Sequence, residues 1–81
     1  MAYNADTQKL VDIFEATRTN RNWARIQCKD GKAIEAFADC FMYETVGDDE
    51  DVDALLLELR DGTNCVIIGE DVESFEVLEK R

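Results

Sequence analysis

Carboxylates and cysteines are the side chains of this chain that could do chemistry, and no histidine accompanies them. Histidine is the usual general base, and a lone serine or cysteine without a base partner has no route to activation. The four glycines are scattered, so the chain also lacks a glycine-rich loop for phosphates. We therefore expect a protein that is not an enzyme, with no catalytic residue and no cofactor.

An acidic run, GDDEDVD at residues 47–53, invites comparison with a calcium site. Asp49, Asp51 and Asp53 have the alternate spacing with which an EF-hand loop begins. The match ends there, since Ala54 stands where that loop needs glycine and Arg60 stands where it needs a bidentate glutamate. We interpret the run as a solvated loop and expect no metal site.

The three cysteines, Cys28, Cys40 and Cys65, are widely spaced and form no CxxC pair. This pattern fits neither a disulfide framework nor a zinc site. Each lies in an apolar strand pattern, where a free cysteine acts as a small hydrophobic residue. We expect three buried thiols in a reducing compartment.

Features of a secretory or membrane protein are absent from the sequence. The first ten residues, MAYNADTQKL, have neither the basic start nor the apolar stretch of a secretory signal. No apolar run approaches the roughly 18 residues that a membrane span needs. We expect a soluble, cytoplasmic protein.

The charge of the chain is strongly negative and unevenly distributed. The net charge is −10, with +2 over residues 1–32 and −14 over residues 33–79. Such a charge repels nucleic acid and anionic lipid, so we expect no DNA or membrane partner and regard RNA as disfavoured. The basic residues of the first part form either a solvated surface, which we favour, or an arc that meets a neighbouring subunit. They are Arg18, Arg21, Arg25, Lys29 and Lys32.

A helix is expected over residues 6–18. Its apolar face comprises Leu10, Val11, Ile13 and Phe14. Either Asn4 or Asp6 can cap its first turn, and Asn20 can end it in a left-handed conformation.

From Trp23 onward the apolar pattern changes to the period of two that is typical of strands. We expect strands at residues 23–28, 34–43, 54–59, 65–68 and 72–78. Asp-Gly pairs at 30–31 and 61–62 predict hairpin turns, and residues 69–71 predict a tight corner. In the second strand the alternation predicts one inward face. It comprises Ile34, Ala36, Ala38, Cys40 and Met42.

The fold class that follows is mainly β: an N-terminal helix and then a strongly bent, five-stranded antiparallel barrel, closed or nearly closed. One domain spans residues 1–81, with the barrel at about 23–79. Trp23 either anchors a partner or, as we favour, covers one end of the barrel beneath the helix.

Three segments resemble the Sm-like (LSm) family of small RNA-binding proteins. They are IQCKDGK at 26–32, DCFM at 39–42 and IIGEDV at 67–72. The resemblance covers essentially the whole chain and implies the family's SH3-like barrel. It also implies that Asp39, Phe41, Tyr43 and Gly69 occupy the RNA-contact positions.

Two of these family positions are altered here. By the resemblance, Phe41 would stack on a base, Tyr43 stands where the family has asparagine, and Ile68 stands where it has arginine. A phenol cannot present the paired donor and acceptor of an amide, and isoleucine offers neither charge nor hydrogen bond. We therefore expect a divergent member whose RNA site is degenerate.

The resemblance further implies a homo-oligomeric ring in which the fourth strand pairs with the fifth strand of the next subunit. The interface residues would be Cys65, Val66, Ile67, Ile68, Phe75 and Val77. Our first hypothesis is a ring-forming binding or scaffold module with an unknown protein partner. The alternatives are an RNA-binding protein of altered specificity that stacks bases on Phe41 and Tyr43, and a monomeric SH3-like adaptor for basic peptides.

Overall fold

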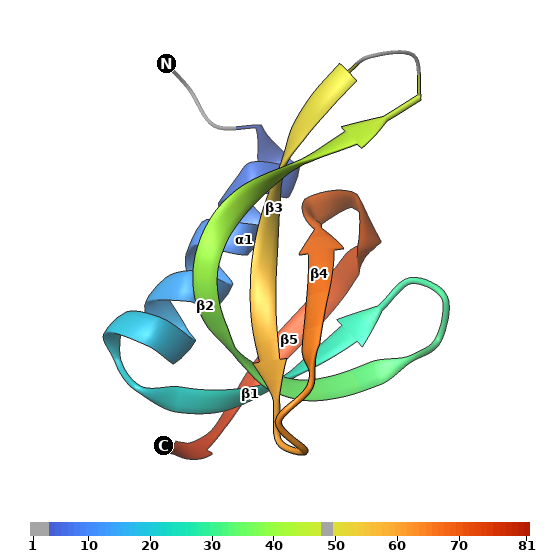
Figure 1. Ribbon diagram of the computed structural model, residues 1–81. Helices are drawn as coiled ribbons and strands as arrows, with labels where there is room; N and C mark the ends of the chain where they lie inside the picture. Colours follow the sequence, from blue (N-terminus) through green and yellow to red (C-terminus); the bar gives the residue numbers. More distant parts are fainter. Residues whose placement is uncertain (1–3, 48–49) are drawn as a thin grey trace.

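The computed structural model describes residues 4–47 and 50–81. Helix α1 (Ala5–Phe14) leads into a π-helical turn (Glu15–Thr19), and five strands follow (Figure 1). The strands are β1 (Asn22–Cys28), β2 (Ala33–Val46), β3 (Glu50–Leu59), β4 (Asn64–Ile68) and β5 (Val72–Lys80). A 3₁₀ turn at Gly69–Asp71 joins β4 to β5. No helix in the described ranges is long and apolar enough to cross a membrane.

The helix occupies the predicted part of the chain. Asn4 caps it, because its Oδ1 accepts a hydrogen bond from the Thr7 backbone N–H at 2.7 Å. The prediction for its end is wrong by one residue: Asn20 has φ −93°, and Arg21 is the left-handed residue, with φ 58°. The cause is the wide π turn, in which the Asn20 N–H reaches back to the Glu15 carbonyl and delays the chain reversal by one residue.

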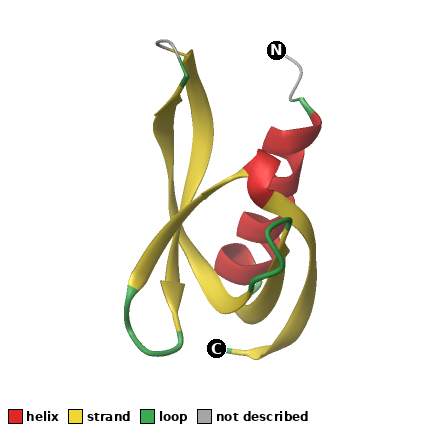
Figure 2. Cartoon of the chain, turned by 90° about the vertical axis from the view of Figure 1, so that its right-hand side faces the viewer, coloured by secondary structure: helices red, strands yellow, loops and turns green. Residues whose placement is uncertain are grey.

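The five strands form one antiparallel sheet in the order β4-β3-β2-β1-β5. Figures 1 and 2 show that the strands curve around α1. β2 has 14 residues and is the shared strand, pairing with β1 near its start and with β3 over most of its length. The strand count, the antiparallel pairing and the strong bend agree with the predicted barrel.

The sheet is not closed, however, so of the two predicted forms, closed or nearly closed, the closed one is wrong. In the described ranges β4 pairs only with β3 and β5 pairs only with β1, so these two strands are edges. The 3₁₀ turn at Gly69–Asp71 causes this, because it carries β5 away from β4 and across to β1.

The core lies between α1 and the concave side of the sheet. Its largest fully buried apolar side chains are Leu10, Ile13, Ile26, Leu55, Leu57 and Val72. Ala36 and Ala38 of β2 are also fully buried, as the alternation predicts. Their small side chains let the helix approach the sheet closely.

A β-bulge at Asp39 ends the predicted alternation. Ala38 pairs with Leu57, but Cys40 already pairs with Leu56, so one residue of β2 is extra. Facing residues of a ladder share one side of the sheet, and the bulge therefore reverses every later side chain. The predictions that Cys40 and Met42 face the core and that all three thiols are buried are wrong. Cys40 is exposed, whereas Cys28 and Cys65 are half-buried.

An ion-pair network covers part of the outer face of the sheet. Arg25 contacts Glu35 at 3.1 Å and Glu76 at 2.8 Å, so this member of the predicted basic arc has partners within the chain. Arg60 contacts Glu35 at 2.8 Å and also pairs with Glu79. The network links β1, β2 and β5 to the end of β3.

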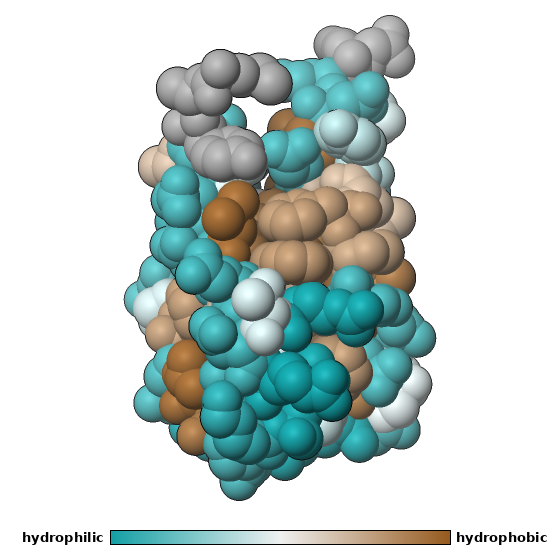
Figure 3. Space-filling view, turned by 90° about the vertical axis from the view of Figure 1, so that its left-hand side faces the viewer, coloured by the Kyte–Doolittle hydropathy of each residue, from teal (hydrophilic) through white to brown (hydrophobic). Residues whose placement is uncertain are grey.

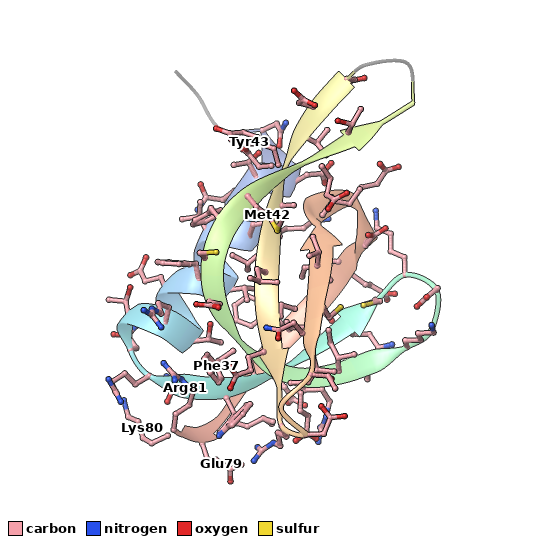
Figure 4. The ribbon with its side chains drawn as sticks, in the orientation of Figure 1. Phe37, Met42, Tyr43, Glu79, Lys80 and Arg81 are labelled. Carbon is pink, nitrogen blue, oxygen red and sulfur yellow. The ribbon has the colours of Figure 1, made fainter. Side chains whose placement is uncertain are left out.

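Trp23 belongs to the same outer face and is half-buried. Its ring packs edge-on against Phe37 at 5.1 Å, and the Arg60 guanidinium lies 4.6 Å from its centroid. At this end of the sheet Arg81 covers the Phe37 ring at 3.8 Å (Figure 4). Trp23 is therefore covered by Arg60 and does not lie beneath the helix.

The ion pairs predict how stability depends on pH. The hydrogen bond from Arg25, followed by the charge of Arg60, lowers the pKa of Glu35 below its ordinary value of 4.5. A lowered pKa stabilises the fold above pH 4.5, and this contribution disappears as the pH falls through the lowered pKa. We expect Glu35→Gln to lower the urea midpoint at pH 7 and the difference from wild type to vanish in acid. Glu73→Gln, at an exposed carboxylate, is the control; a Glu35→Gln difference that persists in acid would contradict the assignment.

Gly69 is required by a close approach between the turn before β5 and the start of α1. A methyl group at this position would overlap the backbone carbonyl of Asp6, which cannot move without shifting the helix. We expect Gly69→Ala to lower the free energy of unfolding by about 1–3 kcal/mol. Glu70→Ala, in the same turn but exposed, should change it by less than about 0.5 kcal/mol. Equal midpoints for the two variants in urea unfolding would refute the close approach.

Candidate binding site beside the helix N-terminus

A buried threonine determines how β2 meets the helical segment. Thr17 is fully buried in the π turn, and its hydroxyl donates to the Ile13 carbonyl at 2.7 Å. The same oxygen accepts a hydrogen bond from the Ala38 backbone N–H at 2.9 Å, immediately before the bulge. One hydroxyl thus satisfies the amide of the strand residue that precedes the bulge.

The bulge turns two aromatic side chains of β2 toward α1. Phe41 packs on Phe14 with ring centroids 4.9 Å apart, yet 43% of its surface is exposed. Tyr43, two residues further on, is 73% exposed. Exposed aromatic surface of this kind on a small protein is typical of a binding site.

These rings line an open groove of about 440 Å³ between α1 and β2. The lining residues are Thr7, Val11, Phe41, Met42, Tyr43 and Asp53. In Figure 3, an apolar surface lies at mid-height on the face of the molecule that is turned toward the viewer. Figure 4 places Met42 and Tyr43 on the upper part of β2, far from Phe37 and Arg81 at the opposite end.

An acidic pocket of about 200 Å³ adjoins the groove. It lies between the start of α1, the start of β3 and the turn after β4. Its carboxylates belong to Asp6, Glu50, Asp51, Asp53 and Glu70. The N-terminal end of a helix stabilises nearby negative charge, which explains how this concentration of carboxylates is tolerated.

Thr7 and Asp53 line both cavities. The Thr7 hydroxyl donates to Asp53 Oδ2 at 3.1 Å, which joins the first turn of α1 to β3. Among the described residues, neither lining includes a lysine or an arginine. Lys9, in the second turn of α1, is held by the Val72 carbonyl at 3.0 Å and by Asp6 at 3.5 Å. The site is therefore an aromatic groove with one carboxylate, that of Asp53, beside a strongly negative pocket.

The structure brings together most of the predicted RNA-contact positions. Phe41 and Tyr43 line the groove, and Gly69 lines the acidic pocket. The two signature segments are adjacent because Met42 pairs with Ala54, which pairs with Ile68. Asp39 is separate from them: it is exposed at the bulge and lines neither cavity.

Sequence reasoning missed four residues of the groove, which are Thr7, Val11, Met42 and Asp53. Thr7 and Val11 belong to the helix, and Val11 was predicted only as part of the apolar face of that helix. Asp53 was considered only as a member of the calcium-like run, of which Asp49 lies outside the described residues. In the described ranges no three His, Cys, Asp or Glu side chains are grouped so that they could hold a metal ion.

The predicted interface residues divide into two sets. Val66 of β4 and Val77 of β5 are 38% and 49% exposed, and Ile68 is half-buried. The others turn inward: Ile67 is buried in the core, and Cys65 and Phe75 pack against it. A partner at these edges would therefore contact Val66, Val77 and the strand backbones.

Comparisons with known proteins add no relative. No protein-family model, no curated protein and no solved structure matches this chain. A fold does not specify a function by itself, so we infer function from the groove, its charges and the sheet edges.

The threonine bridge predicts a selective loss of stability. Thr17→Val keeps the shape of the side chain but leaves the Ala38 N–H buried without a partner, so we expect a loss of about 1–3 kcal/mol in urea unfolding. Thr17→Ser keeps the hydroxyl and should lose less. If valine is tolerated as well as serine, the bridge does not hold β2 to the helical segment.

Proposed function

We propose that the protein is a non-enzymatic, Sm-like binding or scaffold module that assembles into a homo-oligomeric ring through the two edges of its sheet. The observation that carries this proposal is that β4 and β5 are the edge strands of one bent sheet in the described ranges. They are the two strands that the family resemblance expects to pair between subunits.

Unpaired edges present rows of backbone N–H and C=O groups that favour pairing with another chain. Pairing β4 of one copy with β5 of the next is a head-to-tail contact, and such contacts remove every free edge only when they close into a ring. Val66 and Val77 would add apolar contact at the junction, because both are exposed on these strands.

Apolar side chains on the outer face continue to the β4 edge. Cys40, Leu56 and Val66 are paired across β2, β3 and β4, which forms one apolar row that ends at the edge. A chain of 81 residues buries a modest core, so association would add apolar burial that it otherwise lacks.

The charges beside the helix support a ring without the usual RNA site. RNA binding depends on lysine and arginine for phosphate neutralisation. In the part of the chain that the structure describes, the two cavities have carboxylates in their linings and neither of these cations. Tyr43 and Ile68 at the altered positions offer no replacement for amide and guanidinium contacts. RNA therefore remains the less favoured ligand.

The edge-pairing proposal predicts a discrete oligomer that edge charges disrupt. Light scattering coupled to size exclusion at about 10 μM should give a mass above that of a dimer. Val66→Lys and Val77→Lys should each shift the protein toward monomer, because a buried lysine at the junction is costly and edge lysines oppose strand pairing.

Gln27→Lys is the matched control, since it adds the same charge on β1 at a residue that is paired with both β2 and β5. A wild-type protein that stays monomeric at this concentration would remove the ring. Equal dissociation by all three variants would show that the edges are not the interface.

A further inference from the structure

We propose that the groove between α1 and β2 binds a lysine or arginine side chain presented by a basic segment of a partner protein. This site lies on a different surface from the β4 and β5 edges, and the inference holds whether or not the ring forms. It follows from three features of the groove: two exposed aromatic rings, one anchored carboxylate and a surrounding negative charge.

The aromatic walls suit a cation. Phe41 and Tyr43 both face the groove, and the faces of such rings attract an ammonium or a guanidinium. Phe14 packs against Phe41 and holds it in place, which reduces the entropy lost on binding. Val11 offers an aliphatic surface for the methylene stem that every lysine and arginine carries.

Asp53 supplies the countercharge. It faces Tyr43 across the β2–β3 ladder and lines the same groove. Thr7 holds its Oδ2 through a hydrogen bond of 3.1 Å, and in the described part of the chain no other hydrogen bond engages this carboxylate. Its second oxygen is therefore free to accept a charge-assisted hydrogen bond from a bound cation.

The surroundings discriminate against anionic ligands. The carboxylates of Asp6, Glu50 and Glu70 in the adjoining pocket would repel the phosphates of a nucleotide bound in the groove. The same field attracts a basic segment and raises its rate of association. The cavity of about 440 Å³ has room for a side chain and its stem.

The occupant is better assigned to a partner protein than to a second copy. Each copy carries a net charge of −10, which opposes approach of its acidic body to this groove. Arg25 and Arg60 are held in ion pairs within the chain, and Arg81 is held over Phe37. A cationic peptide from another protein supplies the complementary charge without breaking these contacts.

The test uses a fluorescein-labelled hexapeptide of alternating arginine and valine, and a matched peptide with neutral citrulline in place of arginine. Anisotropy titrations at 50 mM salt should detect binding of the arginine peptide that weakens as salt rises. The citrulline peptide should bind at least about tenfold more weakly, because it lacks the charge for both the carboxylate and the rings.

Variants then locate the site. Asp53→Asn and Tyr43→Leu should each weaken the arginine peptide about tenfold. Glu44→Gln removes the neighbouring carboxylate from the opposite side of β2 and should change binding less than twofold. Urea midpoints show that each variant is folded. Val66→Lys, a variant of the sheet edge, should leave peptide binding unchanged, which distinguishes the groove from the proposed ring interface.

Three outcomes would overturn the proposal. Equal weakening by Glu44→Gln and Asp53→Asn would indicate diffuse attraction without a site. Binding of a uridine oligonucleotide that Tyr43→Leu abolishes would assign the groove to nucleobases. Loss of self-association in Tyr43→Leu would assign it to a second copy of the chain.

Discussion

The hydrogen bonds of the Thr17 hydroxyl are the contact on which the arrangement of this molecule depends. They tie the π turn after α1 to β2 at the residue before the bulge. The bulge reverses the faces of β2, so that Ala36 and Ala38 pack in the core while Phe41 and Tyr43 open toward the helix. The bend of β2, the position of the helix on the sheet and the aromatic groove thus depend on the same contact. A single buried polar group, the Thr17 hydroxyl, stabilises all three.

Charge divides the molecule into regions with different roles. On the outer face, Arg25 and Arg60 neutralise Glu35 and its neighbours, so these carboxylates strengthen the sheet. Beside the helix N-terminus only Asp6 has such a partner in the described ranges, Lys9 at 3.5 Å, and the carboxylates form a negative pocket. The aromatic rings that could stack on bases therefore lie next to carboxylates that repel phosphate. The same combination of rings and carboxylates is suited to a cationic side chain.

Sequence patterns predicted the elements more reliably than their local irregularities. The helix and the glycine turns at Gly31 and Gly62, both with positive φ, are where the patterns place them. So are the five strands, except that β3 begins at Glu50, within the run that was expected to be a loop. The bulge was missed because an extra residue leaves no mark on an alternating sequence until the ladder is known. The prediction of closure failed because it depends on the course of β5. The family resemblance brought Phe41, Tyr43 and Gly69 to attention, whereas Thr7 and Asp53 were missed because their contact spans 46 residues of sequence.

The central claim is that β4 and β5 are edges that pair between copies, and amide hydrogen exchange tests it most directly. Protection should be compared at protein concentrations well below and well above the association midpoint. We predict that amides of β4 and β5 become protected as concentration rises, while those of β1, which pairs with both β2 and β5 over residues 24–27, do not change. Fast exchange at both edges that is independent of concentration would contradict the account.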